Sequence, residues 1–477
     1  RLDCKRLNSY KIFNAFALRR PSGMRDIFPI FAIVFIPNIM KRLLISFFLF
    51  TFPFLLFSQD TVREYWKNKN VMSEGIKINN KEEGLWTYYY FTGEKWTQGN
   101  FKNGEKVGTW RVWYADGRTW EEFTLPNGKF SSRFPSGQLE AEGDFVNGKR
   151  DGEWTFFHSN GKLLKKTHYF ADSIHGHVIE YYDDGQKYFE GNYDNGKLHG
   201  YATWYNKNGH PEMEGKSIHD LQDSIWSFYY EDGKLGSRGN FVNGLQDGEW
   251  KYYYGTGELW KKGHFAKGKR EGLWEAWFES GKLQRSGHFV NDLEEGKWEQ
   301  WHENGKTRDI GPFKRGKMHG EWAGFYENGK PKYKSVYTDA QRNGSHTQWD
   351  ESGKLRSKGS YQNDLRHGKW TDYAQNGKPL ETGTYANGKK NGKWMFYDMR
   401  GQKMREQNFV DDATEGVFVE YYPNGKKQMQ GNMKGRLRHG TWSYWSANGK
   451  LIYQVEFEHG NRVKVYVDND PKAKKPF

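Results

Sequence analysis

The chain predicts an all-β fold, an elongated repeat meander of antiparallel β-hairpins with about 16 units of 24 residues. A glycine recurs at this interval over most of the 477 residues. Aromatic residues make up 18% of the chain, although all hydrophobic residues together reach only 35%. From residue 60 onward we find no apolar period of about 3.6 residues that would support a long helix. Short strands with tight turns account for these observations together.

The first 59 residues are expected to lie outside the working protein. Two basic residues follow Met40, and an uncharged apolar stretch of 15 residues comes next. This arrangement is typical of a signal peptide and resembles bacterial export signals that end in Ser-Gln. We interpret residues 40–58 as the signal, with cleavage between Ser58 and Gln59, and residues 1–39 as an upstream leader. A retained membrane anchor is the alternative.

Removal of this leader changes the composition of the protein. The formal charge falls from +14 to +8, and the single cysteine, Cys4, is lost. A chain without cysteine has no disulfide and no cysteine-based zinc site. Such a protein is expected to be stabilised by packing alone. From the signal segment we expect it to be exported, to the periplasm, the outer-membrane surface or the medium.

The repeat is described from its recurring glycine, numbered here as position 0 of each unit. Sixteen units run from Gly84 to about residue 463, and each step is 24 residues except one of 20, from Gly108 to Gly128. The short step predicts a local kink or a missing turn. Residues 59–83 are expected to form an N-terminal cap on the repeats of residues 84–463.

The last segment, residues 464–477, is expected to be a C-terminal tail, because two prolines and several lysines gather there. Within each unit, position 9 is glycine in all 16 cases, and Asn, Asp, Ser or Thr precedes it in 15. Asn-Gly and Asp-Gly pairs favour type I′ hairpin turns, in which both central residues need positive φ. We expect such a turn here, between strands of about six residues.

Three further positions of the unit are aromatic. Position 2 is tryptophan in 11 of 16 units, and position 5 is aromatic in 15 of 16. Position 17 is Phe or Tyr in 13 of the 15 full-length units. Positions 2 and 5 have opposite parity, so a straight strand would place them on opposite faces. Either a bulge lies between them or both faces carry aromatic residues.

Residues 189–200 read Phe-Glu-Gly-Asn-Tyr-Asp-Asn-Gly-Lys-Leu-His-Gly. This segment resembles the MORN repeat, and residues 312–320 match the second half of the same pattern. Where the repeat usually has glycine two residues after His-Gly, this chain usually has tryptophan. It is thus similar to bacterial MORN-variant repeats, some of them catalogued as antitoxin-like. The resemblance implies a hairpin meander, and association with scaffolding, dimerisation and sometimes anionic lipid headgroups.

Two rows of residues are candidates for a binding surface. Lysine often follows the second glycine of the unit, and the aromatic residue at position 5 recurs beside it along the chain. A solvated edge for the lysines, and a core for the aromatic residues, are the structural alternatives. The candidate residues are Lys162, Lys234, Lys282, Lys306, Lys330, Lys354, Tyr253, Trp277, Trp301 and Phe325.

No catalytic constellation emerges from the sequence. We find no Gly-x-Ser-x-Gly, no His-Glu-x-x-His and no P-loop pattern. Histidines such as His175 and His199 precede the position-0 glycine in adjacent units, but Asp and Glu take the same place elsewhere, which favours a polar turn position over a metal site. We therefore expect a protein that is not an enzyme and has no cofactor and no metal.

The sequence thus predicts an extended protein-binding or scaffold surface, with a protein partner. An envelope-surface binder of anionic lipid or polysaccharide is the alternative, because lysines and aromatic residues could meet such ligands. An antitoxin-like neutralising protein is a third hypothesis, which rests on the family resemblance alone. A homodimer is a further expectation from that resemblance, whereas export argues against nucleic acid as a partner.

Overall fold

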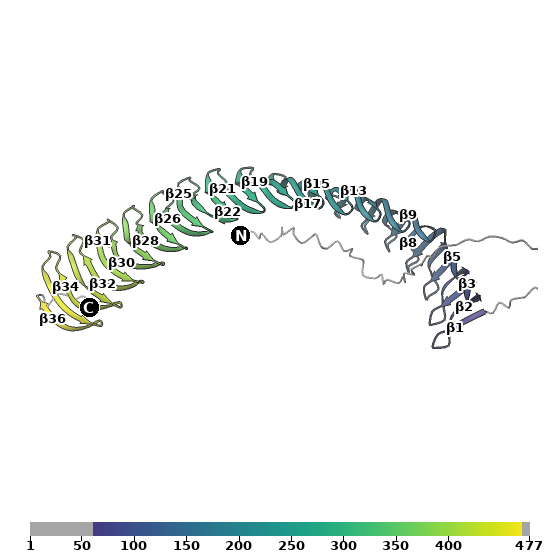
Figure 1. Cartoon of the computed structure of the whole chain (residues 1–477), viewed down its shortest axis with the longest axis horizontal. Helices are drawn as coiled ribbons and strands as arrows, with labels where there is room; N and C mark the ends of the chain where they lie inside the picture. The colour runs from purple at the N-terminus through teal and green to yellow at the C-terminus, as the bar shows by residue number, and fades with distance from the viewer. Residues whose placement is uncertain (1–60, 470–477) are drawn as a thin grey trace, which may run out of the picture. The chain divides into compact units, whose positions relative to one another are not determined.

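The computed structural model describes residues 61–469, and in this part of the chain all regular structure is β-strand. The 36 strands form one sheet. Each strand pairs antiparallel with the next one in the chain, with β23 and β24 both lying against β22. Figure 1 shows the hairpins following one another along an elongated sheet. The predicted meander is confirmed.

The strands are β1 (Thr61–Tyr65), β2 (Val71–Ile78), β3 (Lys81–Tyr89), β4 (Lys95–Lys102), β5 (Glu105–Trp113), β6 (Thr119–Leu125), β7 (Gly128–Arg133), β8 (Leu139–Val146), β9 (Lys149–Phe157), β10 (Leu163–Phe170), β11 (Ser173–Tyr181), β12 (Lys187–Asp194), β13 (Lys197–Tyr205), β14 (Pro211–Ile218), β15 (Leu221–Tyr229), β16 (Leu235–Val242), β17 (Leu245–Tyr253), β18 (Leu259–Ala266), β19 (Lys269–Trp277), β20 (Leu283–Val290), β21 (Leu293–Trp301), β22 (Thr307–Lys314), β23 (Lys317–Met318), β24 (Gly320–Phe325), β25 (Pro331–Thr338), β26 (Gln341–Trp349), β27 (Leu355–Gln362), β28 (Leu365–Tyr373), β29 (Pro379–Ala386), β30 (Lys389–Tyr397), β31 (Lys403–Val410), β32 (Ala413–Tyr421), β33 (Lys427–Lys434), β34 (Leu437–Trp445), β35 (Leu451–Glu458) and β36 (Asn461–Asp468).

The turn at position 9 differs from the expected one. After β17, the N–H of Gly257 donates to the carbonyl of Tyr254 (2.9 Å), and only the glycine has positive φ. This is a type I turn followed by a left-handed glycine, so the type I′ turn expected at position 9 is wrong. Type I′ geometry occurs at the other end of the unit, where Asn243 and Gly244 have φ of 50° and 78°. The strands are mostly 8 or 9 residues long, not six, because the two-residue loop lets pairing continue to the turn.

The position-0 glycine forms a β-bulge. In the pairing of β16 with β17, Gly239 lies opposite Trp250 and Asn240 opposite Asp247, so Gly248 and its successor have no opposite residue. Gly248 has φ of 73°, a left-handed conformation that costs an ordinary residue about 1–2 kcal/mol. Glycine recurs at this position because the bulge repeats from unit to unit, with the pairing of β6 and β7 beside Gly128 as the exception.

A second register shift follows position 4, between Tyr252 and Tyr253 in the example of β17. Position 2 lies opposite position 15 of the same unit, and position 3 opposite position 14. The extra residue at this shift is Trp260 of β18, so β17 has no bulge between positions 2 and 5. Of the two explanations left open by the sequence, the second therefore holds: both faces carry aromatic residues. We call the face with positions 2, 15 and 17 the tryptophan face, and the other, with positions 1, 3, 5, 14, 16, 18 and 21, the mixed face.

The tryptophan face holds the core. Trp250 is 2% exposed and meets Phe241 and Phe265 edge to face, with ring centroids 5.1 and 6.1 Å apart. The same alternation continues from unit to unit through Trp274 and Trp298. Each such pair contributes about 0.5–1.5 kcal/mol beyond burial. A single sheet therefore buries its aromatic residues against the neighbouring units.

Each tryptophan of this ladder lies flat on a glycine of the preceding strand. A Cβ on Gly239 would fall on the indole of Trp250. The indole N–H donates to the carbonyl of Asn240 (3.0 Å), beside the bulge. Where position 2 is His346, position 15 of the preceding unit is Ser335, and the two side chains hydrogen-bond instead. The tryptophan that departs from the usual MORN pattern thus caps the bulge.

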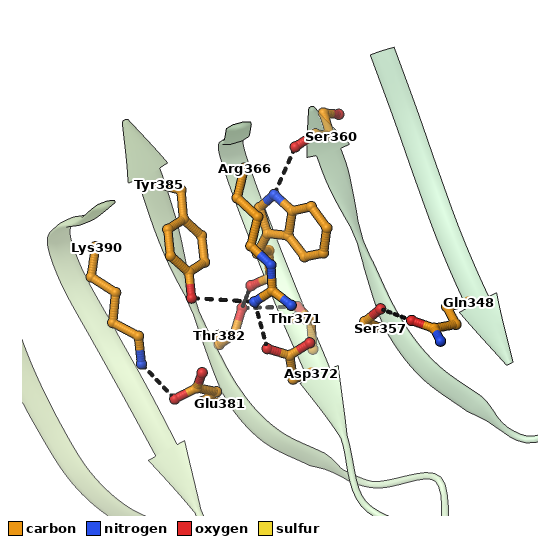
Figure 2. A network of polar contacts seen from close by, with 11 residues as sticks. Gln348, Ser357, Ser360, Arg366, Thr371, Asp372, Glu381, Thr382, Tyr385 and Lys390 are labelled. Atoms are coloured by element: carbon orange, nitrogen blue, oxygen red, sulfur yellow. Dashed lines mark hydrogen bonds and ion pairs between the residues drawn. The ribbon is translucent and has the colours of Figure 1, made fainter. Parts of the chain in front are cut away.

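Cationic side chains cover the tryptophan ladder. Arg366 lies over the ring of Trp370, 4.3 Å from its centroid, and pairs with Asp372 at 3.1 Å (Figure 2). Lys390 takes the same place in the next unit, over Trp394, and pairs with Glu381 at 2.7 Å. Such contacts exclude water from the indoles. Part of the basic charge therefore belongs to the core.

The short unit keeps its hairpin but not the type I′ turn, since Pro126 and Asn127 join β6 to β7 and neither has positive φ. β6 and β7 pair over only three residue pairs, from Glu121–Ser132 to Phe123–Phe130. The four missing residues therefore shorten the ends of two strands beside the turn, and the hairpin itself is kept. At the C-terminal end, β36 continues to Asp468, so residues 464–468 of the expected tail lie in the sheet.

The N-terminal cap region contributes β1 and β2, which continue the same pairing. The expected leader, the signal segment and the Ser58–Gln59 cleavage position lie outside the described residues. Among residues 61–469 no helix has the length and apolar character to cross a membrane.

Candidate binding surface

The lysines after the second glycine connect successive units. Four of the six candidates donate an ammonium hydrogen bond to a carbonyl in the next turn of the same edge. These bonds run from Lys162 to Asp184 (2.6 Å), Lys234 to Gly255 (3.0 Å), Lys306 to Asn328 (2.8 Å) and Lys330 to Ser352 (2.7 Å). Lys282 and Lys354 are exposed at the same edge. The lysines form a row, as expected, but most of them hold the turns together.

The aromatic residues at position 5 form a second row on the mixed face. Tyr253, Trp277, Trp301 and Phe325 are half-buried and come from β17, β19, β21 and β24. Each lies two strands along from the previous one, which gives a spacing of about 9.6 Å. The ammonium of Lys262 lies 5.4 Å from the ring centroid of Trp277. The four aromatic candidates therefore lie in order along one surface.

A further aromatic position, which the sequence did not single out, fixes this row. At position 6, the hydroxyl of Tyr254 donates to the carbonyl of Trp277 (2.8 Å), and that of Tyr230 to the carbonyl of Tyr253 (2.7 Å). Burial raises the pKa of Tyr230 and of Tyr254, so both stay protonated donors. The signal was available in the sequence as a recurrent Tyr or His next to position 5.

Charges of both signs alternate around the aromatic row. Lys262 pairs with Glu275 at 3.2 Å, and Lys251 pairs with Glu249 at 3.2 Å. The hydroxyl of Tyr229 donates to Glu214 at 2.5 Å. Exposed pairs of this kind add little stability, about 0–1 kcal/mol each. They leave the mixed face polar between its aromatic residues, which is the composition of many protein interfaces.

A surface pocket of about 480 Å³ lies at the turn edge of the mixed face. It is lined by Tyr182, Asn206, Lys207, Glu212, Tyr229 and Glu231. It coincides with a unit in which Asn206 takes the place of the position-6 tyrosine, and the amide of Asn206 donates to the carbonyl of Glu231 (2.9 Å). The pocket is open, and its two glutamates come from neighbouring units.

The histidines lie at the type I′ edge. The rings of His199 and His219 are 4.9 Å apart, and His175 approaches Asp194 at 3.3 Å. Within residues 61–469, no three His, Cys, Asp or Glu side chains are arranged to hold a metal ion. These contacts provide polar cross-strand pairing at the turns.

Exposed aliphatic residues are the feature that the sequence analysis missed. They occur at positions 18 and 21, which flank the type I′ turn on the mixed face, as in Val242 and Leu245. A comparison of the same position across units would have revealed them, because most units carry a polar residue at one or both positions.

The repeat matches a family model described as MORN repeat variant. The matched segments are residues 82–103, 150–170, 174–195, 222–243, 246–267, 270–291, 294–315, 318–339, 342–363, 366–387, 414–434 and 438–459. No curated protein matches the chain.

Similar solved structures include a TcdB2–TccC3–Cdc42 crystal structure (10% identity, 86% of this chain and 27% of that chain covered, TM-score 0.14). Another is a Photorhabdus luminescens Tc holotoxin pore (11% identity, 86% and 26% covered, TM-score 0.14). The chain thus spans about a quarter of the length of these proteins. At such TM-scores the likeness carries no argument about fold or function.

Proposed function

Since the chain belongs to the MORN repeat variant family, we propose that it is an exported scaffold whose mixed face binds another protein. MORN repeats are generally binding repeats without enzymatic activity. The observation that carries the proposal is the row of aromatic residues at position 5. Each unit but one contributes one of them to the mixed face, opposite the face that holds the core. Aromatic residues at such places are the usual anchors of protein interfaces.

Support for the anionic-ligand alternative is weaker. Four candidate lysines already donate to carbonyls of the next turn, and cations on the tryptophan face cover indoles. Fewer ammonium groups are then available for phosphate or polysaccharide. No observation on the chain favours the antitoxin-like alternative, and dimer formation remains a proposal within the scaffold function.

The test is recovery of a partner from envelope extract by the full chain at low and high salt. We expect a protein that stays bound at high salt, because apolar contacts are not screened. The double variant Trp277→Ser and Trp301→Ser is expected to lose it. The control, Glu279→Ser and Glu303→Ser, changes exposed turn residues of the same two units and is expected to retain it.

Two outcomes would contradict the proposal. One is recovery of no protein together with salt-sensitive binding to anionic liposomes or polysaccharide, which would favour the alternative ligand class. The other is equal partner recovery by both double variants, which would remove the aromatic row from the interface.

A further inference from the structure

An aliphatic ridge follows the type I′ edge of the mixed face between β14 and β21. Its members flank three of the four turns in this stretch as directly opposed cross-strand pairs, and the turn between β18 and β19 carries Ala266 and Lys269 instead. We define the aliphatic ridge as Ile218 with Leu221, Val242 with Leu245, and Val290 with Leu293. These side chains are 36–50% exposed. Leu221 and Leu245 each reach toward the glycine of the next turn, so the apolar surface continues from one turn to the next.

The ridge is specific to this part of the sheet. The next turn toward the C-terminus is flanked by Lys314 and Lys317, and the preceding one by Asp194 and Lys197. At the same positions further along, Leu365 faces Gln362. Folding does not require aliphatic residues here, since other units form the same turn without them. An exposed apolar strip of several side chains therefore indicates a contact surface.

Carboxylates run beside the ridge, one per unit. They are Asp223, Asp247, Glu271 and Glu295, which precede position 0 in four successive units. Asp247 accepts the backbone N–H of Lys267, and Glu271 that of Asn291. Among the described residues none of these four carboxylates has a Lys or Arg partner within ion-pair distance. The ridge is thus accompanied by negative charge that lacks a cationic side-chain partner.

A hollow of about 200 Å³ opens on the same face, between β19 and β21. Leu273, Ser286, His288 and Lys297 contribute to its lining. Its position next to the Val290–Leu293 pair gives the ridge a recess that an apolar side chain could fill. Protein interfaces commonly concentrate their binding energy at such anchor positions.

The spacing of the ridge residues indicates which secondary structure of a partner segment fits them. Equivalent ridge positions are two strands apart, about 9.6 Å. Seven residues of an α-helix rise about 10.5 Å and return to the same face. An extended strand would need about three residues for this distance, and residues three apart point to opposite faces of a strand. Only the helix presents one aliphatic side chain to every unit.

We propose that the aliphatic ridge is the docking site for an amphipathic helix of a partner protein, with aliphatic residues at a seven-residue period and Lys or Arg beside them. Four units then contact about 20 residues of helix. The basic residues of the partner helix then face the carboxylates at position 23, the position that precedes position 0. This inference rests on the proposed protein-binding function and assigns it a place and a partner chemistry.

The probe is a labelled peptide of about 21 residues, three heptads with leucine at two positions of each and lysine or arginine at the flanking ones. Binding to the full chain is followed by fluorescence anisotropy. We expect the double variant Leu221→Asp and Leu245→Asp to weaken binding at least about tenfold, since these side chains would form the centre of the interface. Leu365→Asp, at the same position of a unit without the ridge, is the matched control and is expected to bind as the parent chain does.

Two further peptides complete the test. One has the same composition with its leucines scattered around the helix, and the other is an extended peptide of alternating valine and lysine. Equal binding of either one, or equal effects of the two leucine variants, would overturn the helix assignment. If the natural partner stays bound to the Leu221→Asp and Leu245→Asp variant but not to the Trp277→Ser and Trp301→Ser variant, the scaffold function stands and the ridge is not its interface.

Discussion

The contact between position 15 and the tryptophan of the next unit offers a sharp test of how this sheet is stabilised. Gly287 lies beneath Trp298, and a Cβ added there would lie 2.6 Å from Cε3 and nearer still to Cδ2 and Cε2. Ordinary carbon contacts are about 3.5–4.0 Å, so Gly287→Ala forces the indole to move by about 1.5 Å. Gly287 has no left-handed φ, so the substitution carries no backbone strain.

The cost follows from what the indole loses. Trp298 is 2% exposed, donates to the carbonyl of His288 (3.2 Å) and meets Phe289 with ring centroids 5.1 Å apart. Overpacking costs about 1–3 kcal/mol and the hydrogen bond about 1 kcal/mol. We expect Gly287→Ala to lower the local unfolding free energy by about 2–4 kcal/mol, and Trp298→Ala by about 3–5 kcal/mol.

The double variant discriminates this contact from two independent effects. With Trp298→Ala in place, the Cβ of Ala at position 287 meets the space that the indole leaves. The combined loss should therefore stay near that of Trp298→Ala alone, which corresponds to a coupling free energy of about 2–4 kcal/mol. Gly255→Ala is the control, since its Cβ would have no neighbour within 4 Å.

Native-state hydrogen exchange of the β20–β22 amides is the appropriate measurement, because a repeat array opens locally and a global midpoint would average over units. Losses in the double variant that equal the sum of the single losses would refute the contact. A loss for Gly255→Ala as large as for Gly287→Ala would show that glycine flexibility, not indole packing, is being measured.

The remaining predictions concern other positions of the unit. Ser224, the non-glycine residue at position 0, has φ of 60°, so Ser224→Gly should stabilise β15–β16 by about 1 kcal/mol in hydrogen exchange. Burial lowers the pKa of His346 to about 4, so the folded protein favours the neutral imidazole. The free energy of unfolding should therefore fall by about 2–3 kcal/mol as the pH drops from about 6.5 toward 4. The pair Ser335→Gly and His346→Trp should remove this dependence in hydrogen exchange measured across that range. Tyr254→Phe removes the bond to the carbonyl of Trp277 and should cost about 1 kcal/mol at that turn, with no change in β30 amides as the internal control.

Much of the fold follows from the sequence because the unit repeats. The glycine at position 0, the tryptophan at position 2 and the aromatic residue at position 17 each recur at a fixed interval, and only a meander of identical hairpins gives all of them the same surroundings. The turn types could not be assigned in the same way. Asn-Gly pairs occur at both ends of the unit, as in Asn195-Gly196 and Asn160-Gly161. The turn type depends on the length of the loop. The longer turn is closed by backbone hydrogen bonds of the position-6 residue.

The surface was less accessible to such reasoning. A lysine such as Lys306 looks free in sequence, since the carbonyl that it reaches belongs to Asn328, one unit away in the chain but adjacent across the hairpins. The same holds for the exposed aliphatic pairs. Their residues look like ordinary strand positions until the register shows that they face away from the tryptophan ladder.

The two faces of the sheet are under different constraints, and this difference indicates where specificity resides. On the tryptophan face, glycine, indole and phenyl rings must fit from one unit to the next, so a change in one requires a compensating change in its neighbour, as in Ser335 with His346. On the mixed face, positions 18 and 21 accept Lys, Gln, Leu or Val without altering the turn. Since other units form the same turn with polar residues there, the aliphatic pairs at three of four neighbouring turns are better explained by a bound partner than by the fold.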